Sequence, residues 1–365
     1  MYIYQNNKWP EFTWDQEQVL ARLSKAKLAQ GLLLGKMGSL GFRLREEAVL
    51  DVLTQDIVKS SEIEGKILDM AEVRSSIARH LGMDIGGRIR ATRDVDGIVE
   101  MMLDAIQNYN ERVTKQRILG WHASLFPTGY SGMFKIKVGQ FRADKKGPMQ
   151  VVSGAHGREK VHYQAPPAKC LESEMSRFLD WCNAQNEMDG VLKAALAHLY
   201  FITLHPFDDG NGRIARALMD LLLARTENTS QRFYSMSTQI QKERSAYYEI
   251  LERTQKGSLN ITDWMLWFLD CLARAIENTK ETLADVLNKA LFWQKFSGVT
   301  LSERQKKIIH KLLNGFEGNL TSSKWAKICK VSQDSANRDI LDLVVKGILK
   351  KEGSGRGINY ILTEL

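Results

Sequence analysis

The sequence has few of the features that mark secreted, membrane-spanning or disordered proteins. Its 365 residues include only 6 prolines and 4 cysteines, and we find no low-complexity tract. The cysteines, at positions 170, 182, 271 and 329, are scattered without a C-x-x-C pair. This scatter predicts free thiols in a reducing compartment, so we expect a cytoplasmic protein.

Long apolar runs are also lacking. The longest apolar stretch, near Ala194 to Leu204, has about half the length needed to span a bilayer and contains His198. The N-terminus shows no apolar segment of the kind found in signal peptides. We therefore expect a soluble protein with no membrane partner.

The charge balance is moderately basic. Lys and Arg exceed Asp and Glu by 8, and the sequence pI is near 9.1. Such an excess suits anionic partners such as nucleotides or nucleic acid. It does not identify them, because many soluble enzymes are equally basic.

Helical periodicity dominates the chain, so the predicted fold class is mainly α. The segment 191–204 is strongly apolar, as a central core helix would be. We expect helices over residues 16–36, 45–60, 70–80, 94–108, 115–126, 168–186, 191–204, 213–225, 247–254, 262–288, 302–313, 321–329 and 332–346.

Three segments depart from this pattern. The aromatic residues 2–14 predict a short strand or an extended arm that packs on the body. Glycine, proline and alternating residues over 130–167 predict loops and one β-hairpin. After residue 302, three helices, a glycine-rich turn and a strand over 358–362 predict a winged helix-turn-helix.

One string carries most of the chemical information: His205-Pro206-Phe207-Asp208-Asp209-Gly210-Asn211-Gly212-Arg213-Ile214-Ala215-Arg216. It predicts a tight loop between two helices, in which glycine and asparagine allow backbone amides to point inward. Such amides at a helix N-terminus attract phosphate, and Arg213 and Arg216 share one helix face. Asp209 is a suitable Mg²⁺ ligand, and His205 is a candidate base. Together these groups are the parts that phosphoryl-type transfer needs.

The same string resembles the signature of the Fic family, H-P-F-x-D/E-G-N-G-R-x-x-R, at every fixed position. The resemblance implies a protein adenylyltransferase, which moves AMP from ATP to a hydroxyl side chain of a target protein or of itself. It implies ranges of 1–95 for an N-terminal arm and inhibitory helical region, 96–290 for the catalytic domain and 296–365 for the winged helix. The hairpin between 139 and 167 would be the flap that docks the target.

The resemblance also implies a role for each residue of the site. His205 would be the base, Asp209 would hold Mg²⁺, and Phe207 would anchor the loop in the core. The remaining residues would bind ATP: the Gly210 and Gly212 backbone and Asn211 at the α-phosphate, Arg213 at the β-phosphate, Arg216 at the γ-phosphate, and Tyr247 and Tyr248 near the adenine.

A second string, Ser60-Ser61-Glu62-Ile63-Glu64-Gly65, resembles the inhibitory pattern S/T-x-x-x-E-G/N of the same family. A carboxylate at Glu64 can pair with an arginine. If that arginine is Arg216, the pair removes the partner of the γ-phosphate. We therefore expect autoinhibition by Glu64 within this motif, which begins at Ser60 and ends at Gly65.

Several alternatives stay open. Tyr247 and Tyr248 are equally compatible with ordinary core packing, and His198 is expected to be buried rather than chemical. Relatives move UMP, phosphocholine or phosphate, and Glu64 would serve removal of AMP in a de-AMPylase.

Outside enzymes, the chain would be a DNA-binding regulator with a nucleotide-sensing domain. In that case the third helix of the predicted winged helix, with Arg338, would read DNA. Lys350, Lys351 and Arg356 of the wing would neutralise phosphates. Homodimerisation is also possible on the sequence alone.

Overall fold

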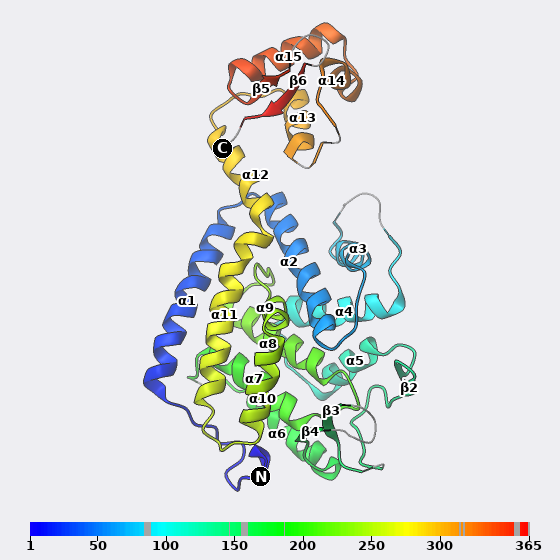
Figure 1. The fold of residues 1–365 in the computed structure, drawn as a ribbon, viewed down its shortest axis with the longest axis vertical. Coiled ribbons are helices and arrows are strands. Elements are labelled where there is room, and N and C mark those ends of the chain that lie inside the picture. The colour runs from blue at the N-terminus through cyan, green and yellow to red at the C-terminus, as the bar shows by residue number, and fades with distance from the viewer. Residues whose placement is uncertain are drawn as a thin grey trace. The chain divides into compact units, whose positions relative to one another are not determined.

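The computed structural model describes residues 1–83, 89–145, 147–154, 160–185, 187–313, 315–316, 318–353 and 358–363. The chain divides into two compact units, Met1–Leu283 and Ala284–Leu365 (Figure 1). The ranges 1–95 and 96–283 thus belong to one compact unit. The three functional ranges expected from the sequence stay a prediction.

The structure is mainly α-helical, as predicted. The helices of the first unit are α1 (Gln16–Gly38), α2 (Phe42–Ile63), α3 (Met70–His80), α4 (Arg93–Gln107), α5 (Lys115–Leu125), α6 (Leu171–Asn183), α7 (Gly190–Leu204), α8 (Asn211–Glu227), α9 (Met236–Lys242), α10 (Arg244–Gln255) and α11 (Thr262–Thr282), with short 3₁₀ turns η1 (Ile3–Gln5) and η2 (Ala168–Cys170). Its strands are β1 (Tyr130–Ser131), β2 (Phe134–Lys135), β3 (Gln150–Ser153) and β4 (Lys160–Gln164).

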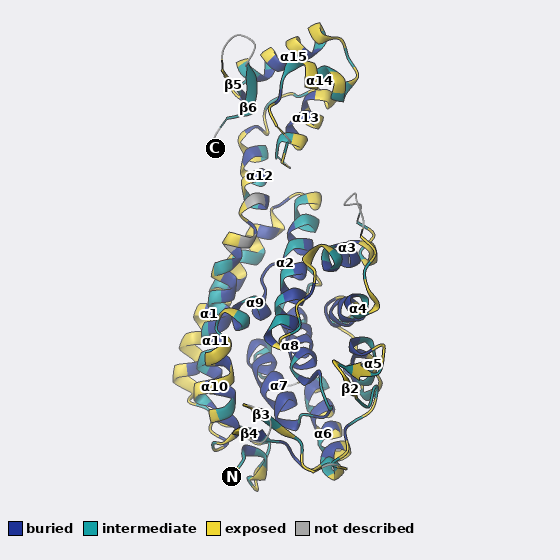
Figure 2. Ribbon diagram, turned by 45° about the vertical axis from the view of Figure 1, so that its right-hand side comes forward, coloured by how far each residue is buried: buried dark blue, intermediate teal, exposed yellow. Residues whose placement is uncertain are grey.

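Helix α7 forms the centre of the first unit. Every residue from Val191 to Leu204 is buried, and α6, α8 and α11 all pack against the helix (Figure 2). This burial confirms the expected core helix and includes His198, which is 1 % exposed. The site therefore follows directly after a fully buried helix.

The predicted hairpin over 130–167 is present as β3 and β4, an antiparallel pair with a register shift between Val151 and Val152. A second, very short pair, β1 with β2, precedes it and was not predicted. Two residues per strand give no alternation that a sequence pattern could reveal.

The N-terminal arm packs on the body, as expected. It contains the 3₁₀ turn η1 and an isolated bridge between Thr13 and Asn260. The ring of Tyr2 contacts that of Tyr163 edge-on, and Trp9 contacts Tyr200 in the same way. Aromatic packing therefore fastens the arm, rather than a continuous strand ladder.

Three helix predictions need correction. Helix α2 runs to Ile63, beyond the expected end at Ser60, so Ser60 lies in the last turn of the helix. The expected helix over 262–288 is broken at Leu283 into α11 and α12 (Ala284–Lys295). Helix α9 was missed, although Ser235 gives it an N-cap by accepting a hydrogen bond from the Thr238 amide.

The second unit consists of α12, α13 (Glu303–Leu313), α14 (Ser322–Cys329), α15 (Gln333–Val345), and the antiparallel strands β5 (Leu349–Glu352) and β6 (Asn359–Leu362). Trp325, Ile340 and Leu343 are almost fully buried in its own core. The order of helices and strands matches the expected one. Arg356 of the predicted wing lies outside the described residues, and the winged-helix assignment stays a prediction.

Within the part of the chain that the structure describes, we find no helix with the length and apolarity needed to cross a membrane.

Helices α4 and α5 approach each other at Gly97. A Cβ atom at this position would lie 1.9 Å from the carbonyl oxygen of Ser124, whereas one at Gly120 on α5 would meet nothing within 4 Å. We predict that Gly97→Ala lowers the free energy of unfolding by about 1–3 kcal/mol through overpacking. Gly120→Ala should raise it by about 0.5–1 kcal/mol, since alanine favours helix. Urea denaturation of both variants tests this, and equal effects would contradict the close approach.

Candidate active site

The site is a loop of six residues between α7 and α8. His205 ends α7 with φ 48°, and Gly210 precedes α8 with φ 83°. A Cβ at Gly210 would also lie 2.9 Å from the ring of Phe126. The loop thus needs a glycine here, and α8 begins directly after it with first-turn amides that lack a helical partner.

Asn211 closes the loop on itself. Its side-chain Nδ2 donates to the carbonyl of Phe207, and its Oδ1 accepts from the amide of Phe207, both at 2.9 Å. The residue is 2 % exposed. The structure therefore places its side chain within the loop, where it fixes the loop shape. A phosphate contact of Asn211 remains a prediction for its backbone amide.

Phe207 is fully buried, as expected for an anchor. Its ring stacks on the imidazole of His122 at 4.1 Å between centroids and 11° between planes. His122 accepts a hydrogen bond at Nδ1 from the Gly139 amide (3.1 Å) and contacts the carbonyl of Asp209 through Nε2 (3.2 Å). These partners define a neutral ring with its proton on Nε2. His122 therefore supports the loop through its ring and its ring nitrogens. Sequence reasoning missed this residue.

His205 presents one ring nitrogen to the site. Its Nδ1 lies 3.3 Å from the carbonyl of Ile202, a contact in which the nitrogen is the donor. The lone pair therefore belongs to Nε2. The ring is partly buried, and this burial lowers the pKa of His205 to about 4, against a smaller opposing effect of the Ile202 hydrogen bond. At neutral pH the imidazole is in the form that accepts a proton.

The carboxylate of Asp209 is 41 % exposed and faces the same space. Its Oδ1 accepts from the Gly210 amide (2.6 Å), and its Oδ2 accepts from the Ser131 hydroxyl (2.5 Å). The Gly210 amide, expected at the α-phosphate, is thus used by Asp209. Ser131, from β1, was missed because its hairpin carries no sequence signal.

Arg213 is buried beside Asp209, with Nη2 3.6 Å from Oδ2. Its guanidinium lies over the ring of Phe126, 5.0 Å from the centroid. Nε and Nη1 have no hydrogen-bond partner among the described residues, although the side chain is only 4 % exposed. A buried cation with unpaired donors fits an anionic ligand, because an unpaired donor costs about 1–3 kcal/mol.

The ion pair expected between Arg216 and Glu64 is present. Arg216 is fully buried, and its Nη2 donates to Glu64 Oε1 and to the carbonyl of Ser60, both at 2.8 Å. Its Nε donates to the Ser60 hydroxyl at 2.9 Å. Ser60 lies in the last turn of α2, where carbonyls lack a helical partner and cations are favoured. The end of α2 therefore binds Arg216 through backbone, hydroxyl and carboxylate together.

The carboxylate of Glu64 also rests on the first turn of α8. A Cβ atom at Gly212 would lie 2.0 Å from Glu64 Oε1. Gly65 adopts φ 79° and turns the chain immediately after Glu64. The carboxylate thus lies against Gly212 in the first turn of α8, the end of a helix that favours anions.

The two tyrosines differ in exposure. Tyr247 is 1 % exposed, and its hydroxyl lies 2.9 Å from Nε2 of His198. Tyr248 is 37 % exposed and donates to the carbonyl of Ile63 at 3.3 Å. Tyr247 is therefore a core residue behind Arg216, while Tyr248 borders the end of α2. A role at the adenine stays a prediction for both.

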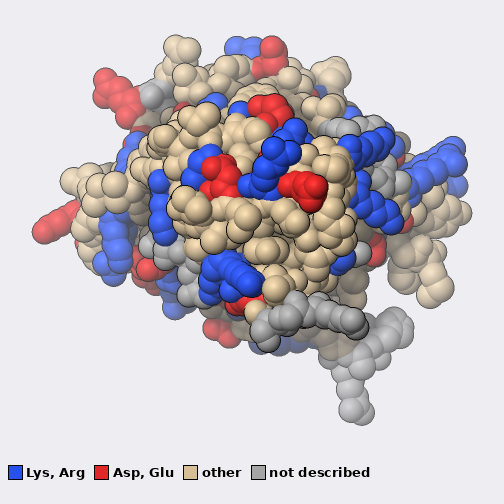
Figure 3. Space-filling view, turned by 90° about the horizontal axis from the view of Figure 1, so that it is seen from above, with Lys and Arg blue, Asp and Glu red and all other residues tan. Residues whose placement is uncertain are grey.

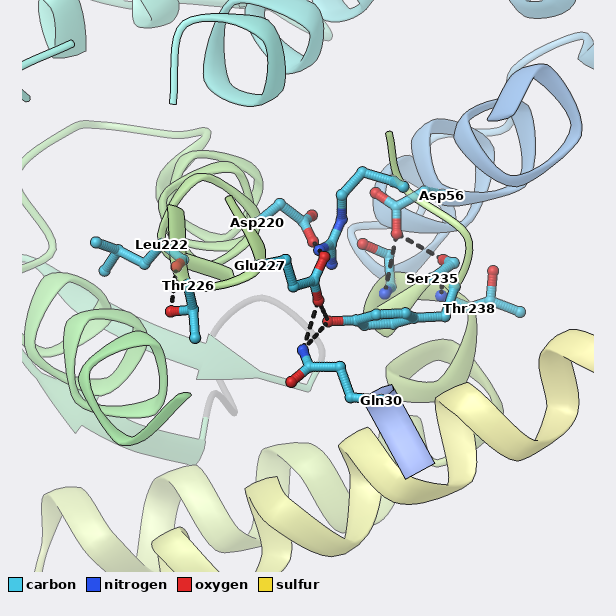
Figure 4. Close-up of polar contacts among 11 residues, drawn as sticks. Gln30, Asp56, Asp220, Leu222, Thr226, Glu227, Ser235 and Thr238 are labelled. Carbon is cyan, nitrogen blue, oxygen red and sulfur yellow. Dashed lines mark hydrogen bonds and ion pairs between the residues drawn. The ribbon is translucent and has the colours of Figure 1, made fainter. Parts of the chain in front are cut away.

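A buried polar network continues the α2–α8 contact (Figure 4). Asp56, one helical turn before Ser60, accepts from the Ser235 hydroxyl at 2.5 Å. Asp220 and Glu227 of α8 both pair with Arg232, at 3.2 and 2.7 Å. Burial, and then the charge of Asp56, raise the pKa of Asp220 well above its usual range. The polar contacts of α2 thus continue from Ser60 back to Asp56, which bonds to the segment that begins α9.

Among the described residues, no three His, Cys, Asp or Glu side chains gather into a metal cage. One accessible carboxylate facing an anion site is instead the arrangement that suits Mg²⁺, which is usually held by one or two carboxylates, water and substrate phosphates. Asp209 beside Arg213 fits that requirement.

Two family models match the chain. Residues 112–223 match the Fic/DOC family, and residues 2–83 match a domain of unknown function, DUF4172. The first range contains the whole loop from His205 to Arg216, and the second contains Ser60 and Glu64. The chain therefore carries a Fic domain.

Curated relatives and solved structures agree with this assignment. Proteins named protein adenylyltransferase Fic from Culex quinquefasciatus and Drosophila willistoni are 28 % and 29 % identical over 238 and 228 residues, which cover 64 % and 61 % of this chain. The chain spans 42 % and 41 % of those relatives. A Fic family protein from Desulfovibrio desulfuricans G20 covers 97 % of this chain and 98 % of its own, with 19 % identity and a TM-score of 0.64, so the two share a fold.

The buried imidazole of His122 should make the free energy of unfolding depend on pH. Burial lowers its pKa to about 4, whereas an unfolded histidine titrates near 6.5. Between these values the unfolded chain binds the extra proton, so acid favours unfolding by up to about 1.4 kcal/mol per pH unit. In His122→Gln the free energy of unfolding should depend less steeply on pH between about 4 and 6.5. An unchanged slope in urea titrations would contradict the neutral, buried ring.

Proposed function

We propose that this protein transfers AMP from ATP to a hydroxyl side chain of a protein. The observation that carries the proposal is the convergence, on one loop and the first turn of the helix after it, of a neutral base, a carboxylate and a buried cation with unpaired donors. These are His205, Asp209 and Arg213. The names of the curated relatives support the same reaction.

The chemistry follows from the site residues. Nε2 of His205 removes the proton of the acceptor hydroxyl, and the oxygen attacks the α-phosphorus of ATP. The bond from this phosphorus to the bridging oxygen breaks, and pyrophosphate leaves. The first-turn amides of α8, including that of Gly212, hold the α-phosphate, while Arg213 and Arg216 bind the β- and γ-phosphates. Tyr248 borders the space for the adenine.

Asp209 is the proposed ligand of Mg²⁺, which neutralises phosphate charge when bound. The two hydrogen bonds from Gly210 and Ser131 fix the direction of this carboxylate before ATP arrives. Pre-orientation of a charged group lowers the reorganisation needed at the moment of reaction.

We further propose that Glu64 inhibits the enzyme. Its carboxylate takes one donor of Arg216 and covers Gly212. A γ-phosphate competes for the same donor, and a bound ATP is turned away from in-line attack as long as Glu64 stays. Removal of AMP from a modified target, assisted by Glu64, is the reverse activity compatible with the same position.

The acceptor is proposed to dock on the β3–β4 hairpin. Val152 and Val161 are 47 % and 37 % exposed there, and a two-stranded sheet offers a free edge to which an extended segment can add. Main-chain pairing selects little sequence, so self-modification is expected beside target modification. The four free cysteines support a reducing, cytoplasmic location.

We predict that Glu64→Gly raises AMP transfer by at least about tenfold, equivalent to about 1.4 kcal/mol in the barrier. The purified protein is incubated with Mg²⁺ and ATP labelled at either the α- or the γ-phosphate, and retained label is counted. Label from the α-position alone identifies AMP. Retained γ-label would indicate phosphate transfer and would contradict the proposal.

Two further variants, each made in the Glu64→Gly background, test the proposed base and the proposed metal ligand separately. His205→Ala should reduce transfer about 10²- to 10⁴-fold while ATP binding persists. Asp209→Asn should reduce transfer and raise the Mg²⁺ concentration required. Retention of α-label in both variants would rule out the assigned roles.

One observation favours a second function in the C-terminal unit. Residues 284–365 contain 14 Lys and Arg against 8 Asp and Glu, so this unit carries 6 of the 8 excess positive charges of the chain. Within it, Asp339 pairs with Arg304 and Asp342 pairs with Lys346. On the face drawn in Figure 3, however, acidic and basic side chains lie side by side. We propose DNA binding by this unit as a candidate.

The test is an electrophoretic shift with duplex DNA at several salt concentrations. Three phosphate contacts predict an affinity loss of roughly 10- to 100-fold between 50 and 200 mM salt. Arg338→Gln combined with Lys351→Gln should weaken binding and flatten this dependence, whereas Lys25→Gln in the first unit should not. The absence of a shift at low salt would exclude the candidate.

A further inference from the structure

Arg142 connects the loop of the site to the hairpin, although it belongs to neither. Its side chain is 1 % exposed. Nε donates to the carbonyl of His205 (2.7 Å), Nη2 to the carbonyl of Pro166 (2.6 Å), and Nη1 to Oδ1 of Asp144 (2.6 Å). A single guanidinium therefore spans three segments of the chain.

The hydrogen bond from Arg142 to the His205 carbonyl stabilises an unfavourable backbone conformation. The backbone of His205 is left-handed, a conformation that is unfavourable for a residue with a Cβ and persists only where its surroundings fix it. The next residue, Pro206, has no N–H with which to close a turn. The Arg142 amide donates to the Pro206 carbonyl at 2.9 Å. Arg142 thus binds two successive carbonyls at the bend that aims the imidazole.

The other half of the guanidinium fixes the base of the hairpin. Pro166 lies two residues after the end of β4, and Asp144 lies in the segment that leads into β3. Oδ2 of Asp144 accepts from the Ala168 amide at 2.6 Å. Arg142 and Asp144 together therefore fasten both ends of the hairpin to the bend at His205.

We propose that Arg142 is a positioning residue that holds the bend at His205 and the base of the β3–β4 hairpin as one rigid piece. Resting on the proposed function, this sets the distance between a hydroxyl docked on the hairpin and Nε2 of His205. Such a residue touches neither ATP nor the acceptor. It acts on the rate through geometry, since a misplacement of about 1 Å can cost about 10²-fold.

The charge of Arg142 supports the same role. Among the charged groups near His205, Arg142 lowers the pKa of the imidazole, while Glu64 and Asp209 raise it. The ion pair with Asp144 moderates this influence. Loss of the guanidinium should therefore loosen the bend and also raise the pKa of His205, two effects that a residue important only for folding would not combine.

The experiment compares Arg142→Met, Arg142→Lys and Arg117→Met, each in the Glu64→Gly background. Arg117 is a matched control, because its guanidinium likewise binds a carboxylate (Asp104) and backbone carbonyls, including those of Asp104 and Asn108, but lies outside the site. The readouts are self-labelling from α-labelled ATP as a function of pH, the Kd for ATP, and the NMR titration of the His205 imidazole.

We expect Arg142→Met to lower labelling about 10²-fold with a change in Kd for ATP of no more than about twofold. The acidic limb of its pH profile should move to higher pH, together with the His205 titration. Arg142→Lys, which keeps the charge but reaches fewer acceptors, should lose activity and retain the pKa. If the methionine variant does not fold, the lysine variant still tests the proposal. Arg117→Met should match its parent.

Labelling of Arg142→Met within about threefold of its parent, or an unchanged His205 titration, would overturn the proposal. Amide exchange of residues 160–168 adds a readout that needs no activity, and it should accelerate in Arg142→Met alone. If the Glu64→Gly parent transfers no AMP, the proposed function fails. The titration and exchange results then still decide whether Arg142 holds the bend and the hairpin together.

Discussion

The guanidinium of Arg216 is sealed from solvent, and the end of α2 supplies acceptors for its Nε and Nη2, while Nη1 has no hydrogen-bond partner among the described residues. Removing such a cation from water costs several kcal/mol unless partners replace the lost hydration. Ser60 provides a hydroxyl and a carbonyl, and Glu64 provides a carboxylate. The polar end of α2 is therefore placed against the core of the domain, where an apolar helix face would ordinarily lie.

In the proposed function, inhibition and catalysis share one residue, Arg216. A phosphate oxygen and the Glu64 carboxylate are chemically equivalent acceptors for Nη2 of Arg216. Exchange of one for the other leaves the two bonds to Ser60 in place. The helix need not unfold or leave the domain for the site to become competent, and only the residues around Glu64 and Gly65 have to move.

The sequence predicted most of the features whose residues lie close together along the chain. The segment from His205 to Arg216 and the string from Ser60 to Gly65 each carry their spacing within a dozen residues. The loop, the burial of Phe207 and the Arg216–Glu64 pair followed from them. Helix periodicity likewise gave the mainly α fold, although it failed where burial extended α2 beyond Ser60 and where Leu283 divided one expected helix into two.

The supporting residues could not be found in this way. His122, Ser131 and Arg142 contact the loop from segments more than sixty residues away in sequence. A lone histidine, serine or arginine has no pattern of its own. Asn211 shows a related limit, because its residue type suggested ligand binding while its side chain serves the loop.

Polar residues near the end of α2 recur about once per helical turn. Asp56, Ser60 and Glu64 recur at four-residue intervals. Ser60 bonds to Arg216 of α8, and Asp56 bonds to Ser235 just before α9. Helical residues succeed one another by about 100°. A shift of α2 by a single residue would thus turn both Ser60 and Asp56 away at once. The register of α2 therefore sets the contact of Ser60 with Arg216 and the contact of Asp56 with Ser235 together.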